Sequence, residues 1–350
     1  MTFSYGRELS GNWGSVSWRG QPITGRQLVT WAGAGIWLLL MFVSTGTSGI
    51  VALWTALVFL ASLVVLTSAT RTVSIRKVIS LFLLGGFTMG LAHFVAQFLN
   101  HSALRDFTVP PMEEMFKIAP VLFVLWRGRR STTWTLGVTD VMLLATASGV
   151  GFGMVEDAYI RHNHGWPAHI DWLPLTEITG GRLIVGHGIW TALAGITLGL
   201  ALLLRSRREL AIGLGASGFL WSTLDHIANN FGVGQRGALA SFLNGITGQG
   251  WVTFYLFVVG VVIAIGFDLY IIHGQLPRFP DFKMPRSQGG LSGLKTMWGF
   301  LVVKRALAYS IFRYRRASSL ARIEFSFRAI LDKYLVTRPP SQTPVPQNQL

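Results

Sequence analysis

The chain has 350 residues, of which 51% are hydrophobic and only 13% are charged. Soluble domains usually carry about 25% charged residues, so this composition indicates an integral membrane protein. The sequence contains no cysteine, which excludes disulfides, zinc–thiolate sites, iron–sulfur clusters and thiol nucleophiles. The formal net charge of +15 is concentrated towards the C-terminus, which favours contact with anionic lipid over nucleic acid as its explanation.

Residues 1–27 form a polar segment without the features of a cleavable signal peptide, and we predict that it lies in the cytoplasm. Apolar runs follow, each long enough, or nearly so, to span about 30 Å of hydrocarbon. They lie at residues 28–44, 50–68, 79–99, 111–126, 134–160, 183–204, 210–231 and 250–272. We therefore predict an all-α fold, a polytopic bundle of about eight transmembrane helices over residues 28–272. The fourth run is the shortest, at about 24 Å, so one of its ends should start below the membrane surface.

Residues 273–350 form a basic tail, predicted to be cytoplasmic. Within residues 300–336, apolar residues recur at helical spacing among arginines, which predicts an amphipathic helix on the inner leaflet that binds anionic lipid.

Lysine and arginine alternate between the polar segments that separate the apolar runs. One side of the membrane receives 25 of the 30 basic residues and the other receives four. The positive-inside rule then places both termini in the cytoplasm of a multi-pass protein of the cell membrane.

This topology brings ionisable residues of four helices to one depth, in the outer leaflet. They are Glu113, Glu114, Lys117, Glu156, His187 and His226. Each has a structural alternative. The stretch "VPPMEEMFK" could be a helix start, in which glutamates complement the helix dipole and Lys117 pairs with Glu113 one turn on. Yet ionisable residues inside a membrane usually have a functional role. Because these six share a depth and a chemistry, we predict that they form one site rather than separate structural contacts.

Carboxylates and imidazoles together can activate water, either directly or through a bound metal. His187, His226 and Glu156 would provide three ligands for zinc, with a fourth position open. Without a metal, Glu113 or Glu114 could deprotonate water while a histidine stabilises the oxyanion. The residues alone leave both mechanisms open.

Further polar residues lie near the predicted site. His93, Gln97 and Asn100 form one polar face of the third helix, which could support the site, line a water path or bond between helices. Asp157 and Asp225 are adjacent to the site residues and have no role that the pattern assigns.

The ordered motifs resemble the PrsW family of intramembrane proteases, relatives of the CAAX-prenyl-protease and bacteriocin-processing families. The matching residues are Glu113-Glu114-x-x-Lys117, Phe152-x-x-x-Glu156, His187, and His226 followed by Asn229 and Asn230. The resemblance covers roughly residues 80–270 and leaves the basic tail outside. It implies cleavage of a single-pass membrane protein, such as an anti-sigma factor, on its extracytoplasmic side. It also implies a metallopeptidase, although relatives have been argued to use glutamate and histidine alone.

Two other classes of function are compatible with buried charges in a membrane protein. An ion- or proton-coupled transporter would use Glu, His and Lys as a relay, but such proteins tend to show internal repeats and charges near the midplane. A non-catalytic scaffold would use its basic tail to recruit partners. We expect an intramembrane endopeptidase.

Overall fold

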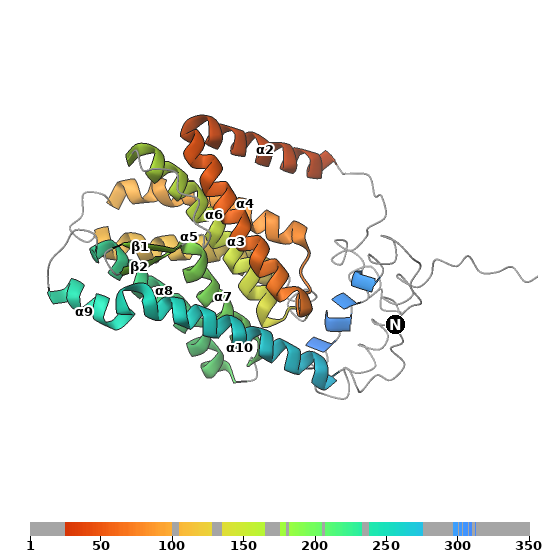
Figure 1. Ribbon diagram of the computed structural model, residues 1–350. Coiled ribbons are helices and arrows are strands. Elements are labelled where there is room, and N and C mark those ends of the chain that lie inside the picture. The colour runs from red at the N-terminus through yellow and green to blue at the C-terminus, as the bar shows by residue number, and fades with distance from the viewer. Residues whose placement is uncertain are drawn as a thin grey trace, which may run out of the picture.

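The computed structural model describes residues 25–99, 105–127, 135–164, 176–179, 182–204, 207–232, 238–275 and parts of 297–312. These residues are mostly helical, which confirms the predicted helical fold (Figure 1). The elements are α2 (Gly25–Thr45), α3 (Thr47–Leu66), η1 (Thr67–Ala69), α4 (Ile75–Leu99), α5 (Arg105–Arg127), α6 (Val138–His164), β1 (Thr176–Thr179), β2 (Arg182–Val185), α7 (His187–Leu203), α8 (Arg208–Gly232), α9 (Ala238–Thr247), η2 (Gly248–Gly250) and α10 (Trp251–Gln275). The two strands form a short antiparallel hairpin just before α7.

Each of the eight apolar runs overlaps one long helix, and the short helix α9 was not predicted. Among the described residues, four segments are long and apolar enough to cross a membrane: Thr47–Ala69, Ile75–Leu99, Val138–Ile160 and Ala238–Gln275. Helix α7 has 17 residues and so covers only about 25 Å, while α5 and α8 carry charged residues. The count of eight spans therefore stays a prediction.

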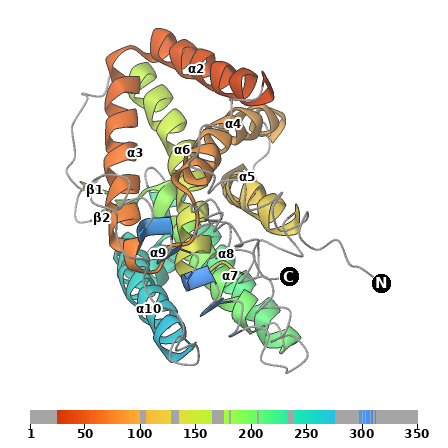
Figure 2. The same ribbon diagram turned by 90° about the vertical axis from the view of Figure 1, so that its right-hand side faces the viewer.

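Helix α6 is the central element, packed against α3, α4, α5, α7 and α10 (Figures 1 and 2). Glycines allow its neighbours to approach closely. A Cβ atom on Gly151 would lie 1.8 Å from the carbonyl oxygen of Phe82 in α4, and one on Gly85 would lie 1.9 Å from that of Ser148. Small residues at such contacts are the usual means of tight helix packing in membranes.

Helix α2 is oriented differently from the rest of the bundle. In both views it runs across one end of α3 and α6 rather than alongside them (Figure 2). The change of direction occurs at Gly46, whose φ of 59° lies in the left-handed region that favours glycine.

Two buried aspartates close the opposite end of α6. Asp268 of α10 accepts hydrogen bonds from the backbone N–H groups of Val138 (2.9 Å) and Thr139 (2.8 Å) and from the Thr139 hydroxyl (2.6 Å). Asp140 accepts bonds from the N–H groups of Thr72 and Val73, which precede α4. These carboxylates satisfy the free donors at the start of α6 and join α6 to α4 and α10.

Part of the predicted tail packs on this end of the bundle. Arg305 donates to the carbonyl oxygens of Ser68 (2.7 Å) and Arg71 (3.1 Å), and the buried Tyr309 hydroxyl donates to that of Thr70 (3.1 Å). Burial raises the pKa of Tyr309 well above its ordinary value, which keeps this donor protonated. Most of the predicted amphipathic helix at 300–336, and residues 1–24, lie outside the described residues.

We expect Asp268→Ala to lower the free energy of unfolding by about 2–4 kcal/mol, because it leaves buried N–H donors of α6 without an acceptor. Thermal unfolding of the purified protein in detergent measures the change. Glu209→Ala is the matched control, since Glu209 is an exposed carboxylate at the start of α8. Equal stability of the two variants would contradict the role given to Asp268.

Candidate active site

The glutamates of α5 do not cap its N-terminus, so the helix-start interpretation of "VPPMEEMFK" is wrong. Helix α5 begins at Arg105, with Asp106 in its first turn and both Pro110 and Pro111 inside the helix. Glu113 therefore lies about two turns along, beyond the reach of the dipole effect at a helix end. At 23 residues, or about 35 Å, α5 is also not the short helix that the sequence predicted.

A buried ion pair lies at the centre of the site. Lys117 and Glu114 are 0% and 2% exposed and contact each other directly. The pair is spaced i,i+3, whereas the sequence predicted an i,i+4 pair between Lys117 and Glu113. The adjacent carboxylate, that of Glu113, does not contact Lys117 in this way and points towards α8 instead.

His226 of α8 lies between the two adjacent glutamates. Its Nδ1 atom is 2.9 Å from Glu114 Oε1, and its Nε2 atom is 3.5 Å from Glu113 Oε2. A single imidazole thus connects the buried carboxylate of the ion pair to the more exposed one.

His187, the first residue of α7, connects Lys117 to α6. Its Nδ1 atom lies 2.6 Å from Lys117 Nζ, and its Nε2 atom faces the Glu156 carboxylate. An ammonium group can only donate, so Nδ1 accepts and the ring proton lies on Nε2. Gly149 and Gly153 of α6 make room for this arrangement: a Cβ on Gly149 would lie 2.6 Å from the His187 carbonyl oxygen.

Trp190 contacts several members of this cluster, and sequence analysis did not identify it. Its ring stacks on His226 at 4.3 Å and 19°, and meets His187 edge-on at 5.2 Å. The Lys117 ammonium lies 5.3 Å from the ring centroid, within range of a cation–π contact. The i,i+3 spacing from His187 on α7 was the available signal, but an apolar helix offers many such pairs.

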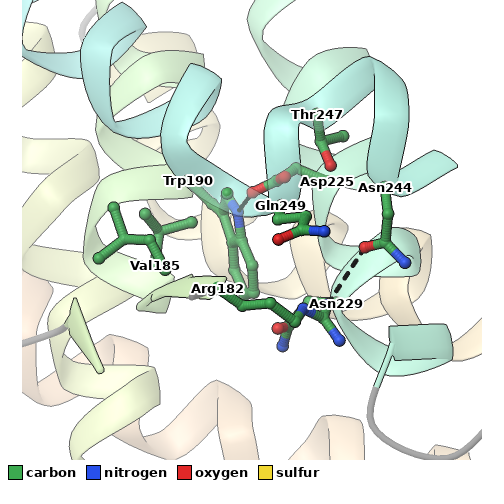
Figure 3. A pocket seen from close by; sticks show the side chains of 10 residues that line it. Arg182, Val185, Trp190, Asp225, Asn229, Asn244, Thr247 and Gln249 are labelled. Carbon is green, nitrogen blue, oxygen red and sulfur yellow. Dashed lines mark hydrogen bonds between the residues drawn. The ribbon is translucent and has the colours of Figure 1, made fainter. Parts of the chain in front are cut away.

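Asp225, which had no assigned role, fixes the orientation of Trp190. Its Oδ2 atom accepts a hydrogen bond of 2.7 Å from the indole Nε1–H (Figure 3). Both residues line a pocket of about 190 Å³ together with Arg182, Asn229 and Asn244, and none of the three site glutamates lines it. Arg182 donates to Asn244 there, at 3.2 Å.

The structure thus brings together all six predicted site residues, from α5, α6, α7 and α8. Of the other polar residues singled out, His93 and Gln97 line a cavity that Glu113 and Glu156 also reach. Asn229 lines the same pocket as Trp190 and Asp225, and Asn100 lies outside the described residues.

Three residues are placed to share one metal ion. Glu113, His187 and His226 each offer a ligand atom, and these atoms lie within 4.8 Å of one another. The sequence instead predicts Glu156 as the ligand that joins the two histidines. The 3.5 Å between His226 Nε2 and Glu113 Oε2 is close to the roughly 3.4 Å expected for ligands about 2.1 Å from a tetrahedral ion. The donor set therefore fits zinc, provided that His187 gives up one of its two present contacts.

A family model described as the PrsW family intramembrane metalloprotease matches residues 34–267, about two thirds of the chain. The chain belongs to this family. No curated protein and no solved structure matches it. The PrsW assignment confirms the predicted resemblance, and with it a membrane protein whose family carries out intramembrane proteolysis.

We expect Asp225→Leu to lower kcat for a membrane-peptide substrate about tenfold, because the indole N–H of Trp190 loses its acceptor and the ring is free to leave His226. Asp225→Asn keeps an acceptor oxygen and should retain most of the activity. KM should change little in either variant, since Asp225 does not line the cavity that the carboxylates reach. Wild-type kcat in Asp225→Leu would contradict this role.

Proposed function

We propose that this PrsW-family protein is an intramembrane endopeptidase that hydrolyses membrane-anchored protein substrates near the extracytoplasmic face of the cell membrane. One observation carries the proposal. Four helices deliver three carboxylates, two imidazoles and a lysine to one continuous cluster, and only part of that cluster reaches a cavity. Charged residues that only stabilise helix ends would not need to reach one cavity together.

The exposure of each carboxylate suggests its task. Glu113 and Glu156 are 14% and 21% exposed and line the cavity, whereas Glu114 is 2% exposed and contacts both Lys117 and His226. We assign Glu114 and Lys117 to holding the two histidines in place. Glu113 and Glu156 are left as the groups that can meet water and substrate.

The charge balance supports a divalent cation. Three carboxylates and one ammonium leave a formal charge of −2 when both imidazoles are neutral. An unbalanced charge is costly where water is scarce. Either two protons on the histidines or one divalent cation would bring the sum to zero. The family name, a metalloprotease, favours the cation, and the donor set favours zinc.

Glu113, His187 and His226 would hold this ion. A bound zinc ion supplies Lewis acidity, which makes a neighbouring water more acidic and polarises the carbonyl of the substrate. Glu156 lies against His187 but outside the donor set, so we assign it as the general base. As the oxygen of water bonds to the scissile carbonyl carbon, Glu156 takes a proton from the water. It then returns the proton to the amide nitrogen as the C–N bond breaks.

The substrate class we propose is a single-pass membrane protein, of which an anti-sigma factor is an example that the family resemblance implies. The distribution of basic residues supports cytoplasmic termini and a site in the outer leaflet. The basic tail, on the cytoplasmic side, would bind anionic lipid.

We expect Glu156→Gln to reduce cleavage by about 10²–10⁴-fold, the usual contribution of a general base, while the protein still accumulates in the membrane. Quantitative proteomics of membranes that contain wild-type or Glu156→Gln protein should then reveal an accumulating single-pass substrate. Glu209→Gln, on an exposed carboxylate remote from the cluster, is the control and should behave as wild type. A substrate that is cut equally fast by the Glu156→Gln protein would refute the proposal.

Metal content separates the two possible ligand sets. We expect purified wild-type protein to bind about one zinc ion, Glu113→Gln and His226→Ala to lose it, and Glu156→Gln to keep it. Elemental analysis after dialysis against a weak chelator makes the measurement. Loss of zinc from Glu156→Gln but not from Glu113→Gln would instead make Glu156 the metal ligand and Glu113 the general base. Full activity of a metal-free protein would show that glutamate and histidine act alone.

A further inference from the structure

A cavity of about 490 Å³ lies between α4 and α5, beside the catalytic cluster. Three helices line it, and apart from Ala96 of α4 the lining residues of each helix are spaced four apart, which places them on single helix faces. Helix α4 contributes Met89, His93 and Gln97, α5 contributes Arg105, Val109 and Glu113, and α6 contributes Phe152 and Glu156. The catalytic carboxylates therefore sit in the wall of this cavity.

The α4 residues that line the cavity differ from the other exposed residues of this helix. Leu91, Phe94 and Phe98 are 50%, 56% and 73% exposed, as expected of a helix that faces lipid. His93 and Gln97 are exposed as well, although they lie within a candidate membrane span. Polar groups facing hydrocarbon are costly unless they find partners, so these two side chains suit a cavity that takes a polar ligand, although His93 also meets the Tyr159 ring edge-on at 5.8 Å.

The size of the cavity limits the conformation of that ligand. Two turns of an α-helix about 10 Å in diameter occupy about 850 Å³, more than the 490 Å³ of empty space between α4 and α5, which includes the opening to the surface. An extended segment fits more readily. Its backbone N–H and C=O groups have no partners of their own, and the bilayer offers none. The amide of Gln97 can both donate and accept, and His93 adds a second polar group.

The pocket that Trp190 and Asp225 line provides a contrast. Its volume is about 190 Å³, and Glu113 and Glu156 are not among its lining residues. Trp190, held by Asp225 (Figure 3), lines that pocket and also stacks on His226. Of these two cavities in the described part of the chain, only the one between α4 and α5 reaches the catalytic carboxylates.

We propose that the substrate passes from the bilayer between α4 and α5 and lies in this cavity as an unwound, extended segment, with its backbone hydrogen-bonded by Gln97 and His93. The proposal rests on the protease function and specifies where its substrate binds. Only residues 100–104 connect the two helices, so Gln97 and Arg105 lie at one end of the cavity. The segment thus runs from that end towards Glu113 and Glu156.

The absence of cysteine from the sequence makes a reversible test possible. Ala96 and Val109, on opposite walls, are both changed to cysteine and bridged by a short bis-methanethiosulfonate reagent. The probe is a synthetic single-pass transmembrane peptide with a fluorophore and quencher flanking a Gly-Gly step, in liposomes with the full chain. Bridging should reduce cleavage at least tenfold, and reduction with dithiothreitol should restore it. Each single-cysteine variant, treated alike, is the control.

Neighbouring residues of α4 provide a matched pair. Gln97→Leu should lower kcat/KM about tenfold, whereas Phe98→Leu, on the lipid-facing side, should stay within twofold of wild type. Binding is measured separately in a Glu156→Gln background. A benzophenone attached to cysteine in place of Gln97 should crosslink to the probe, and one in place of Phe98 should not.

The two proposals fail in different ways. Cleavage that continues unchanged in the bridged and Gln97→Leu proteins would overturn this binding site and leave the protease function intact. A probe that crosslinks at position 97 in the Glu156→Gln background, but is not cut by the wild-type protein, would refute the protease function and support the site. Equal crosslinking from positions 97 and 98 would overturn the site whatever the activity.

Discussion

The ion pair between Lys117 and Glu114 is the interaction on which the site depends. Both side chains are buried, and a buried charge is tolerated only when it is paired and hydrogen-bonded. The two histidines fill hydrogen-bonding positions that the pair leaves free: His226 contacts Glu114, and His187 contacts Lys117. The requirement to satisfy this pair therefore orients both imidazoles before any substrate arrives.

Close helix packing is the second constraint, because the histidines belong to different helices from the ion pair. Gly149 and Gly153 admit His187 against α6, and the α4 contact at Gly85 and Gly151 holds the other side of α6. At the opposite end, Asp140 and Asp268 tie the start of α6 to its neighbours. A firmly anchored central helix holds Glu156 in a fixed place, at the wall of the cavity between α4 and α5.

The sequence predicted the main elements and the six site residues because both leave strong local signals. Apolar runs mark the helices, and charges inside such runs are rare enough to identify. Boundaries were less predictable: Pro110 and Pro111 suggested a helix start, but α5 begins at Arg105, where Asp106 can complement the helix dipole. The partners were also missed. The rotation of each helix about its axis decides whether Lys117 pairs with Glu113 or Glu114, and which carboxylate joins the histidines. Hydrophobic periodicity does not define this rotation in a helix that is buried on several sides.

Trp190 shows why a catalytic arrangement is more than its ionisable residues. An aromatic residue in an apolar helix gives only a weak signal in the sequence, yet this ring touches His226, His187 and Lys117 at once. Its hydrogen bond to Asp225 explains an aspartate that otherwise had no place in the motif. Trp190 and Asp225 line a separate pocket, whereas Glu113 and Glu156 line the cavity between α4 and α5. The ring and the two carboxylates thus belong to one cluster but lie beside different cavities, which is why a charge-based reading of the sequence finds the carboxylates and not the ring.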